Sequence, residues 1–201
     1  MSLRTDLALE SAQQVSPDAL PEGVTKLERS RKDIRLEVTE ITIETENAAR
    51  LINKPAGRYI TVESSDGSFS SYSDFFDGRV NCLAKEITRL CNIPERVLVV
   101  GLGNRSITPD SLGPRVAERI FATRHIKKLA KDLDTSHLCD VAALTTGVMA
   151  QTGVESSACV KAICNEISPQ LVIVIDALAC SELSHLGTTV QLCNTGISPG
   201  S

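Results

Sequence analysis

The sequence predicts an α/β fold built on a mostly parallel sheet with helices on both faces and further strands added by the N-terminal part. Residues 97–100 and 171–175 are continuous aliphatic runs, as expected of strands that are buried on both faces of a parallel sheet. Segments with apolar residues at helical spacing lie between the expected strands, which is typical of βαβ units. The 201 residues suffice for one such domain with a sizeable core.

The N-terminal part begins with a polar segment. Residues 1–31 are interrupted by Pro17 and Pro21, so we expect an extended or weakly ordered arm. Alternation of apolar and polar residues from Ile34 through Ile43 predicts a half-buried strand. The remaining elements expected here are a helix over 46–53, a turn over 55–57, a strand over 59–62, a loop over 64–78 and a helix over 80–90.

From residue 97 onwards, strands and helices alternate. The strand over 97–100 leads through Gly101-Leu-Gly103-Asn104 into an expected helix that carries Leu112, Val116 and Ile120. The later elements are a strand over 141–144, a helix over 154–167 that stops before Pro169, a strand over 171–175 and a further strand over 188–192. Whether residues 1–93 form a separate subdomain or extend the same sheet stays open. We expect the arm, 1–31, to be followed by a single α/β domain over 32–201.

Composition narrows the function classes. The net charge is −4 and the pI is near 5.4, which argues against binding nucleic acid through bulk positive charge. No apolar run approaches the ~18 residues of a membrane span, and residues 1–6 contain no signal-peptide core, so we expect a soluble intracellular protein. The seven cysteines show no C-x-x-C or zinc-type spacing, and we interpret them as structural free thiols.

The glycines of Gly101-Leu-Gly103 invite comparison with a dinucleotide-binding turn. The third small residue of that motif would be Ser106, and no acidic residue ends a second strand at the expected distance. No Gly-Lys-Ser/Thr follows, as a phosphate-binding loop would need. We interpret the glycines as a tight turn.

Two carboxylates are the main catalytic candidates. Asp110 lies between the strand over 97–100 and its helix, and Asp176 directly follows the strand over 171–175. Ligands of open parallel sheets bind beyond the carboxyl ends of the strands, where both residues lie. Either aspartate alone is typical of a helix cap. Together they could act as an acid/base pair, because two nearby carboxylates push their pKa values apart.

Several ordered motifs resemble the germination proteases of spore-forming bacteria, across nearly the whole chain. They are Arg4-Thr-Asp-Leu-Ala8, Gly57-Arg-Tyr-Ile-Thr-Val-Glu-Ser64, Val99-Val-Gly-Leu-Gly-Asn104, Thr108-Pro-Asp-Ser-Leu-Gly-Pro114, Thr146-Gly-Val-Met149, Gln151-Thr-Gly-Val-Glu155, Ile173-Val-Ile-Asp-Ala-Leu-Ala179 and Thr195-Gly-Ile-Ser-Pro-Gly-Ser201. The resemblance implies an endopeptidase that starts the degradation of small acid-soluble spore proteins. It also implies a phosphorylase/hydrolase-like α/β fold related to the hydrogenase maturation endopeptidases.

The resemblance assigns roles to the aspartates. The family's two essential aspartates match Asp110 and Asp176, of which one would act as general base on a water while the other, protonated, polarises the carbonyl or protonates the leaving amine. No cofactor is expected. In the hydrogenase maturation relatives, the acid that matches Asp110 binds a metal ion together with a second acid and a His. Binding of a divalent ion by Asp110 and Asp176 is therefore an alternative that stays open. His185 does not match that histidine, and we interpret it as a lone surface residue.

The resemblance further implies a zymogen that removes a short propeptide by self-cleavage. The matching bond is Asp6–Leu7, which makes residues 1–6 the propeptide, and Thr5-Asp-Leu-Ala-Leu-Glu10 resembles the family's substrate sequence. Family members continue beyond the segment matching 195–201, so we expect the C-terminal part of the family's chain to be missing here. We also expect a homotetramer in the cytoplasm of the forespore and in the spore core, with spore proteins as partners and without direct nucleic-acid or membrane contact.

Three other interpretations stay open at this point. One is a metal-dependent maturation-type peptidase on the same fold. Another is a non-catalytic module that binds a nucleotide or small molecule at Gly101–Asn104. The last is an inactive remnant in which Asp110 and Asp176 are only caps.

Overall fold

The computed structural model of the chain describes residues 5–15, 19–67, 69, 78–129, 132 and 134–197. The chain divides into two compact units, which are described separately. Unit 1 comprises Met1–Asn92 and Leu178–Gly196, and unit 2 comprises Ile93–Ala177 and Ile197–Ser201. The expected α/β class is confirmed, with an antiparallel sheet in unit 1 and a parallel sheet in unit 2.

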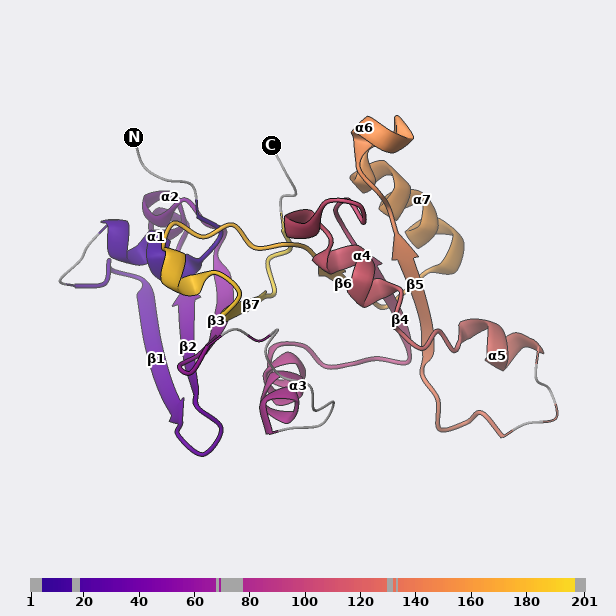
Figure 1. Cartoon of the computed structure of the whole chain (residues 1–201), viewed down its shortest axis with the longest axis horizontal. Helices are drawn as coiled ribbons and strands as arrows, with labels where there is room; N and C mark the ends of the chain where they lie inside the picture. Colours follow the sequence, from indigo (N-terminus) through magenta and orange to yellow (C-terminus); the bar gives the residue numbers. More distant parts are fainter. Residues whose placement is uncertain are drawn as a thin grey trace. The chain divides into compact units, whose positions relative to one another are not determined.

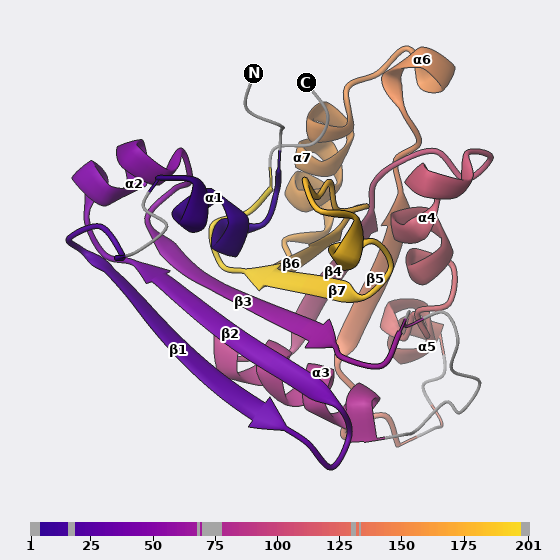
Figure 2. The same cartoon turned by 60° about the vertical axis from the view of Figure 1, so that its left-hand side comes forward.

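The sheet of unit 1 has four strands in the order β1-β2-β3-β7, all antiparallel to their neighbours (Figures 1 and 2). The strands are β1 (Val24–Arg31), β2 (Leu36–Ile43), β3 (Gly57–Ser64) and β7 (Thr189–Cys193). Three helices accompany them, α1 (Ala8–Val15), α2 (Glu46–Ile52) and α3 (Gly78–Leu90), and a short 3-10 turn, η3 (Leu183–His185), precedes β7.

Alternation along these strands creates two separate cores. One face buries Ile41, Ile43 and Tyr59 against small residues of α1 and α2. The other face buries Val38 and Val62, together with Leu36 and Ile60, in a cluster that includes Cys82 and Leu83 of α3. The sheet of unit 1 is therefore covered by helices on both faces.

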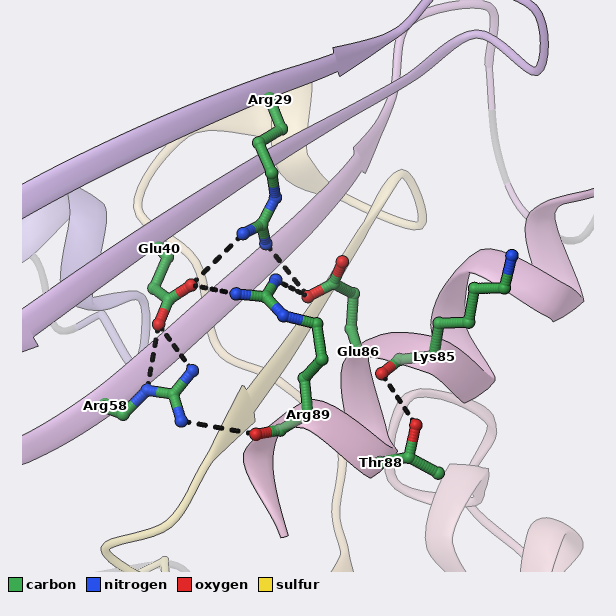
Figure 3. Close-up of polar contacts among 7 residues, drawn as sticks. All are labelled: Arg29, Glu40, Arg58, Lys85, Glu86, Thr88 and Arg89. Atoms are coloured by element: carbon green, nitrogen blue, oxygen red, sulfur yellow. Dashed lines mark hydrogen bonds and ion pairs between the residues drawn. The ribbon is translucent and has the colours of Figure 1, made fainter.

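An ion network anchors α3 to this sheet (Figure 3). The Glu40 carboxylate of β2 accepts hydrogen bonds from Arg58 (Nε 2.9 Å, Nη2 2.7 Å) and from Arg89 (Nη2 3.2 Å). Arg29 lies between Glu40 (3.4 Å) and Glu86 (2.9 Å), and Arg89 also contacts Glu86 at 2.7 Å. Burial raises the pKa of Glu40, but Arg58 and the other guanidiniums outweigh it and hold that pKa below its usual value. Loss of one partner would leave a buried, uncompensated charge.

Unit 2 is built on a three-stranded parallel sheet with β4 at its centre, in the order β5-β4-β6. The strands are β4 (Arg96–Gly101), β5 (Asp140–Thr145) and β6 (Leu171–Ile175). Leu98 and Val100 face α7 (Ser156–Ile167), whereas Gly101 faces α4 (Leu112–Ala117) on the opposite side. The other elements are η2 (Thr108–Asp110), α5 (Arg124–Leu129) and α6 (Met149–Thr152).

The N-terminal arm differs from the expectation. We expect an extended or weakly ordered arm over residues 1–31, yet Ala8–Val15 is helical and Val24–Arg31 is a full strand of the sheet. Leu7, Ala8 and Ala12 are at most 1% exposed, so burial of a few small or apolar residues stabilises a segment of low overall hydrophobicity.

Two further expectations need correction. The helix expected to carry Leu112, Val116 and Ile120 is α4, which ends at Ala117, and it leaves Leu112 51% exposed. Its buried residues are Gly113, Pro114 and Ala117, because a close backbone approach rather than large side chains forms this contact. The strand expected over 188–192 exists as β7, but it pairs with β3 in unit 1. Residues 1–92 thus supply three strands of a sheet separate from that of unit 2, and β7 adds the fourth strand. Most of the expected loop over 64–78 lies outside the described residues.

Candidate active site

The turn Gly101-Leu-Gly103-Asn104 at the carboxyl end of β4 forms the base of the candidate site. A Cβ on Gly101 would lie 2.2 Å from the Gly113 carbonyl oxygen. Gly103 has a φ of +110°, and a Cβ there would lie 2.2 Å from the Asp110 carbonyl oxygen. Both glycines therefore allow the segment from Asp110 to Gly113 to pack directly on the turn, which accounts for the pattern that resembles a nucleotide-binding motif.

Asp110 closes the loop that follows this turn. One of its carboxylate oxygens, Oδ2, accepts a hydrogen bond from the Asn104 backbone N–H at 2.7 Å. Its own N–H donates to the Ile107 carbonyl oxygen at 2.9 Å. The cap position of α4 is Ser111, whose side chain makes no capping bond, so Asp110 is not the N-cap of this helix. The half-buried carboxylate is instead directed at the turn after β4.

Asp176 lies at the end of the neighbouring strand. It directly follows Ile175, which is paired with Gly101 in the parallel ladder between β4 and β6. The Leu102 N–H donates to the Ile175 carbonyl oxygen at 2.9 Å, and a Cβ on Gly113 would lie 2.4 Å from that same oxygen. The Asp176 Oδ1 accepts the Ala177 N–H at 2.8 Å. The structure thus brings Asp110 and Asp176 to the same edge of one sheet, at the ends of adjacent strands.

Asn104 and Gln151 join the same edge, although neither was predicted as a residue of the catalytic site. Asn104 was named only as the end of the alternative nucleotide-binding segment Gly101–Asn104. Asn104 is 8% exposed, and its Oδ1 accepts hydrogen bonds from the Ser106 N–H (2.9 Å) and from Gln151 Nε2 of α6 (3.1 Å). Thr146, just after β5, donates through Oγ1 to Ser156 Oγ at 3.1 Å. The signal that could have found them is the rule that pointed to the aspartates, since these polar residues follow the carboxyl ends of β4 and β5.

The expected self-cleavage residues, Asp6 and Leu7, lie in unit 1, whereas both candidate catalytic aspartates lie in unit 2. The Asp6 N–H donates to the Ala179 carbonyl oxygen at 2.8 Å, and the Ala179 N–H donates to Asp6 Oδ2 at 3.0 Å. The Asp6 carbonyl oxygen accepts hydrogen bonds from Gln191 Nε2 (2.8 Å) and Lys54 Nζ (3.1 Å). Leu7 is fully buried, so both sides of the expected bond are held by the protein.

His185 is not the lone surface residue that we expected. Its ring Nδ1 lies 2.6 Å from Glu10 Oε1, and its Nε2 lies 3.8 Å from Glu63 Oε1. Glu10, only 2% exposed, also accepts hydrogen bonds from the Ser181 N–H (2.9 Å) and Oγ (2.6 Å) and from the Glu182 N–H (3.3 Å). Burial raises the pKa of Glu10, but these hydrogen bonds outweigh it and lower that pKa to about 2.

All seven cysteines are free thiols, of which only Cys82 is buried. The described residues contain no group of three or more His, Cys, Asp or Glu side chains that could hold a metal ion. Among these same residues, no helix has the length and apolar character needed to cross a membrane.

Comparisons with known proteins give one consistent result. The family described as germination protease matches residues 4–201. Curated germination proteases from Caldanaerobacter subterraneus subsp. tengcongensis and Clostridium perfringens (strain SM101) are 39% and 38% identical over 203 and 205 residues, which cover 100% and 99% of this chain. The germination protease of Clostridium tetani is 37% identical over 204 residues and 100% of this chain. The aligned part spans 61–62% of the length of these relatives.

Proposed function

The chain belongs to the germination protease family, and on that premise we propose that it acts as an endopeptidase whose catalytic groups are the carboxylates of Asp110 and Asp176. The observation that carries the proposal is the placement of both aspartates at the carboxyl ends of adjacent strands β4 and β6. Ligands of open parallel sheets bind at this edge.

The proposed reaction is the hydrolysis of a peptide bond by the two carboxylates. The ionised carboxylate removes a proton from a water molecule, whose oxygen attacks the scissile carbonyl carbon while the protonated carboxyl group donates a hydrogen bond to the carbonyl oxygen. The tetrahedral intermediate then loses the amine, which leaves with a proton from a carboxyl group as the C–N bond breaks. One carboxyl and one amine product result, and the pair is returned to its singly protonated form.

The roles of Asn104 and Gln151 follow from their contacts. Asn104 holds Asp110 through its backbone N–H and holds Gln151 through its side chain. We assign both as positioning residues, because a catalytic carboxylate must be kept within a narrow range of positions to reach the substrate.

We propose that the reaction needs no resident metal ion. The two carboxylates by themselves supply the general base and the general acid that hydrolysis requires. A chelator is expected to leave the rate of cleavage unchanged. Activity that is lost with the chelator and restored by added metal would instead favour the maturation-type metallopeptidase.

Membership of the germination protease family supports proposals on the substrate, the location, the assembly and the processing of the protein. We propose that the substrates are small acid-soluble spore proteins, that the protein acts in the forespore and spore core, and that it assembles as a homotetramer. We also propose that the protein is made as a zymogen, which removes residues 1–6 by cutting the Asp6–Leu7 bond. The sequence Asp6-Leu7-Ala8 places an acidic residue, a large apolar residue and then Ala, as in the substrate pattern of the family.

The test compares the protein with its Asp110→Asn and Asp176→Asn variants, each extended to the length of the curated relatives. A peptide that contains Glu-Ile-Ala and the N-terminus of the protein itself are followed by mass spectrometry. Cleavage of both by the parent, with at least a hundredfold slower cleavage by each variant, is expected if both carboxylates take part in acid/base catalysis. Equal cleavage by parent and variants would reject the catalytic pair, and an intact peptide with every protein would reject the protease function.

A further inference from the structure

The side chain of Gln191 holds residues 6–8 in an unusual way. Its Nε2 donates to the Asp6 carbonyl oxygen at 2.8 Å, and its Oε1 accepts the Ala8 N–H at 2.8 Å. The amide thus pairs with the two backbone groups that flank Leu7, which are the groups that a neighbouring strand would use. Because Gln191 belongs to β7, the sheet of unit 1 binds this segment through one side chain.

Two more contacts hold the same segment. The Ala179 backbone exchanges hydrogen bonds with the Asp6 N–H and with the Asp6 carboxylate, at 2.8 and 3.0 Å. Lys54 Nζ donates to both the Thr5 and the Asp6 carbonyl oxygens at 3.1 Å. The Asp6 carbonyl therefore receives one donor from β7 and another from the loop after α2.

The residues after Asp6 are equally fixed. Leu7 and Ala8 are 0% exposed, and α1 begins at Ala8. The Leu7 N–H donates to Thr5 Oγ1 at 3.0 Å. Hydrolysis requires that an attacking water and the catalytic groups reach the carbonyl in near-attack geometry. A bond whose backbone is fixed between a buried leucine and the start of a helix cannot extend into the active site of a protease, so it does not offer that geometry.

We infer that Lys54, Ala179 and Gln191 form an intramolecular clamp that protects the Asp6–Leu7 bond, so that this bond is cut only after the clamp opens. The inference rests on the proposed function only in taking this bond as the site of self-processing. Protection itself is a property of the folded chain and applies to any protease.

The clamp also defines what it binds. It accepts a segment with a carboxylate that reaches the Ala179 N–H, followed by a large apolar residue in a fully enclosed position and then a residue as small as Ala8. The backbone contacts of Gln191 are independent of side chains, so they provide affinity, whereas the buried positions of Leu7 and Ala8 provide selectivity. Its occupant is therefore an acidic–apolar–small segment of the chain itself.

The experiment measures protection with an added endoproteinase that cuts after Asp and Glu. The parent chain carries Asp110→Asn, which removes the proposed self-cleavage while an amide oxygen can still accept the Asn104 N–H. Cleavage at Asp6–Leu7 is followed by intact mass and compared with cleavage after the exposed Asp134. The test variants are Gln191→Glu, which cannot donate to the Asp6 carbonyl, and Lys54→Met. Gln170→Ala is the matched control, because it removes a side-chain contact to the Arg96 backbone in unit 2.

We expect slow cleavage at Asp6–Leu7 in the parent and in Gln170→Ala, and roughly tenfold faster cleavage in Gln191→Glu and Lys54→Met, with the rate after Asp134 unchanged. Equal rates at Asp6–Leu7 in all four proteins would overturn the clamp. If a variant unfolds unit 1, cleavage also accelerates after Glu40, which is buried in β2 of that unit. In that case hydrogen exchange of the Ala8 amide in the folded parent tests the clamp. A slowly exchanging Ala8 amide supports the clamp and a freely exchanging one rejects it. An unprocessed active enzyme with a protected bond would refute self-processing while leaving the clamp intact.

Discussion

The substitution Gly113→Ala tests how the candidate site is held together. Gly113 lies in α4, where its backbone packs against the ends of β4 and β6. An added Cβ would lie 2.3 Å from the Leu102 carbonyl oxygen and 2.4 Å from the Ile175 carbonyl oxygen. Ordinary contact begins at 3.4 Å, so α4 would have to move by about 1 Å away from both strands. Because Asp110 directly precedes this helix, its carboxylate would move as well.

Two opposing effects set the magnitude. Alanine in a helix is favoured over glycine by about 1 kcal/mol. Overpacking costs about 1–3 kcal/mol, and the upper end applies here because the obstacles are backbone atoms that cannot turn away. We therefore expect a net loss of roughly 2 kcal/mol in the free energy of unfolding, which corresponds to a decrease of roughly 4–8 °C in melting temperature for a chain of this size.

Urea and thermal unfolding followed by circular dichroism measure this difference. Arg115→Ala is the control, because it places alanine on the exposed side of the same helix and is expected to change stability by less than about 0.5 kcal/mol. A Gly113→Ala protein that is as stable as the parent or more stable would show that helix propensity dominates. The close approach would then not be what holds α4 and Asp110 on the sheet.

Three other predictions each concern the hydrogen bonds of one buried polar side chain. The pKa of Glu10 is about 2, against an ordinary 4.5. This carboxylate therefore stabilises the fold fully above about pH 4.5, and the stabilisation, roughly 3 kcal/mol, is lost as the pH falls toward 2. Acid unfolding curves should show this loss in the parent but not in Glu10→Gln, and superimposable curves would contradict it. Glu40→Gln should lower the free energy of unfolding by about 3 kcal/mol, because three arginines lose a charged partner. Urea unfolding measures this difference. An unchanged free energy of unfolding would mean that solvent replaces the carboxylate. Asn104→Ala should reduce kcat for cleavage of the Glu-Ile-Ala peptide by about tenfold or more while leaving KM nearly unchanged. The reason is that the substitution releases Gln151 without removing a proposed catalytic group. An unchanged kcat would remove Asn104 from the proposed site.

Much of the fold could be predicted from the sequence where burial dominates. The aliphatic run of β4 is buried between covering layers, and the alternation of β2 is that of a sheet with different faces. The run of β6 was expected to be buried as well, but β6 is an edge strand and each of its residues is only half-buried. Strand β1 was missed because only Val24 at its start is buried, and the rest, Thr-Lys-Leu-Glu-Arg-Ser-Arg, is stabilised by pairing and by ion contacts such as that of Arg29. Such contacts leave no periodic pattern.

The candidate site was predictable in part for a similar reason. Asp110 and Asp176 follow strands that are recognisable in the sequence, so a rule about strand ends finds both. His185 was misjudged because its partner, Glu10, lies far away in the chain and no local pattern connects them. The same holds for Gln191, whose amide binds Asp6 and Ala8 across most of the sequence.

The pairing of β3 with β7 has a consequence for how the chain is made. Strand β3 ends at Ser64 and β7 begins only at Thr189, so about 125 residues are synthesised before β3 gains its second neighbour. At a ribosomal rate of about 5–20 residues per second, that edge stays open for roughly 6–25 s. A strand with free backbone groups can join another nascent chain during that time. Slower translation of residues 93–177 should therefore increase aggregation of newly made protein, and a chain that ends before β7 should keep this open edge permanently.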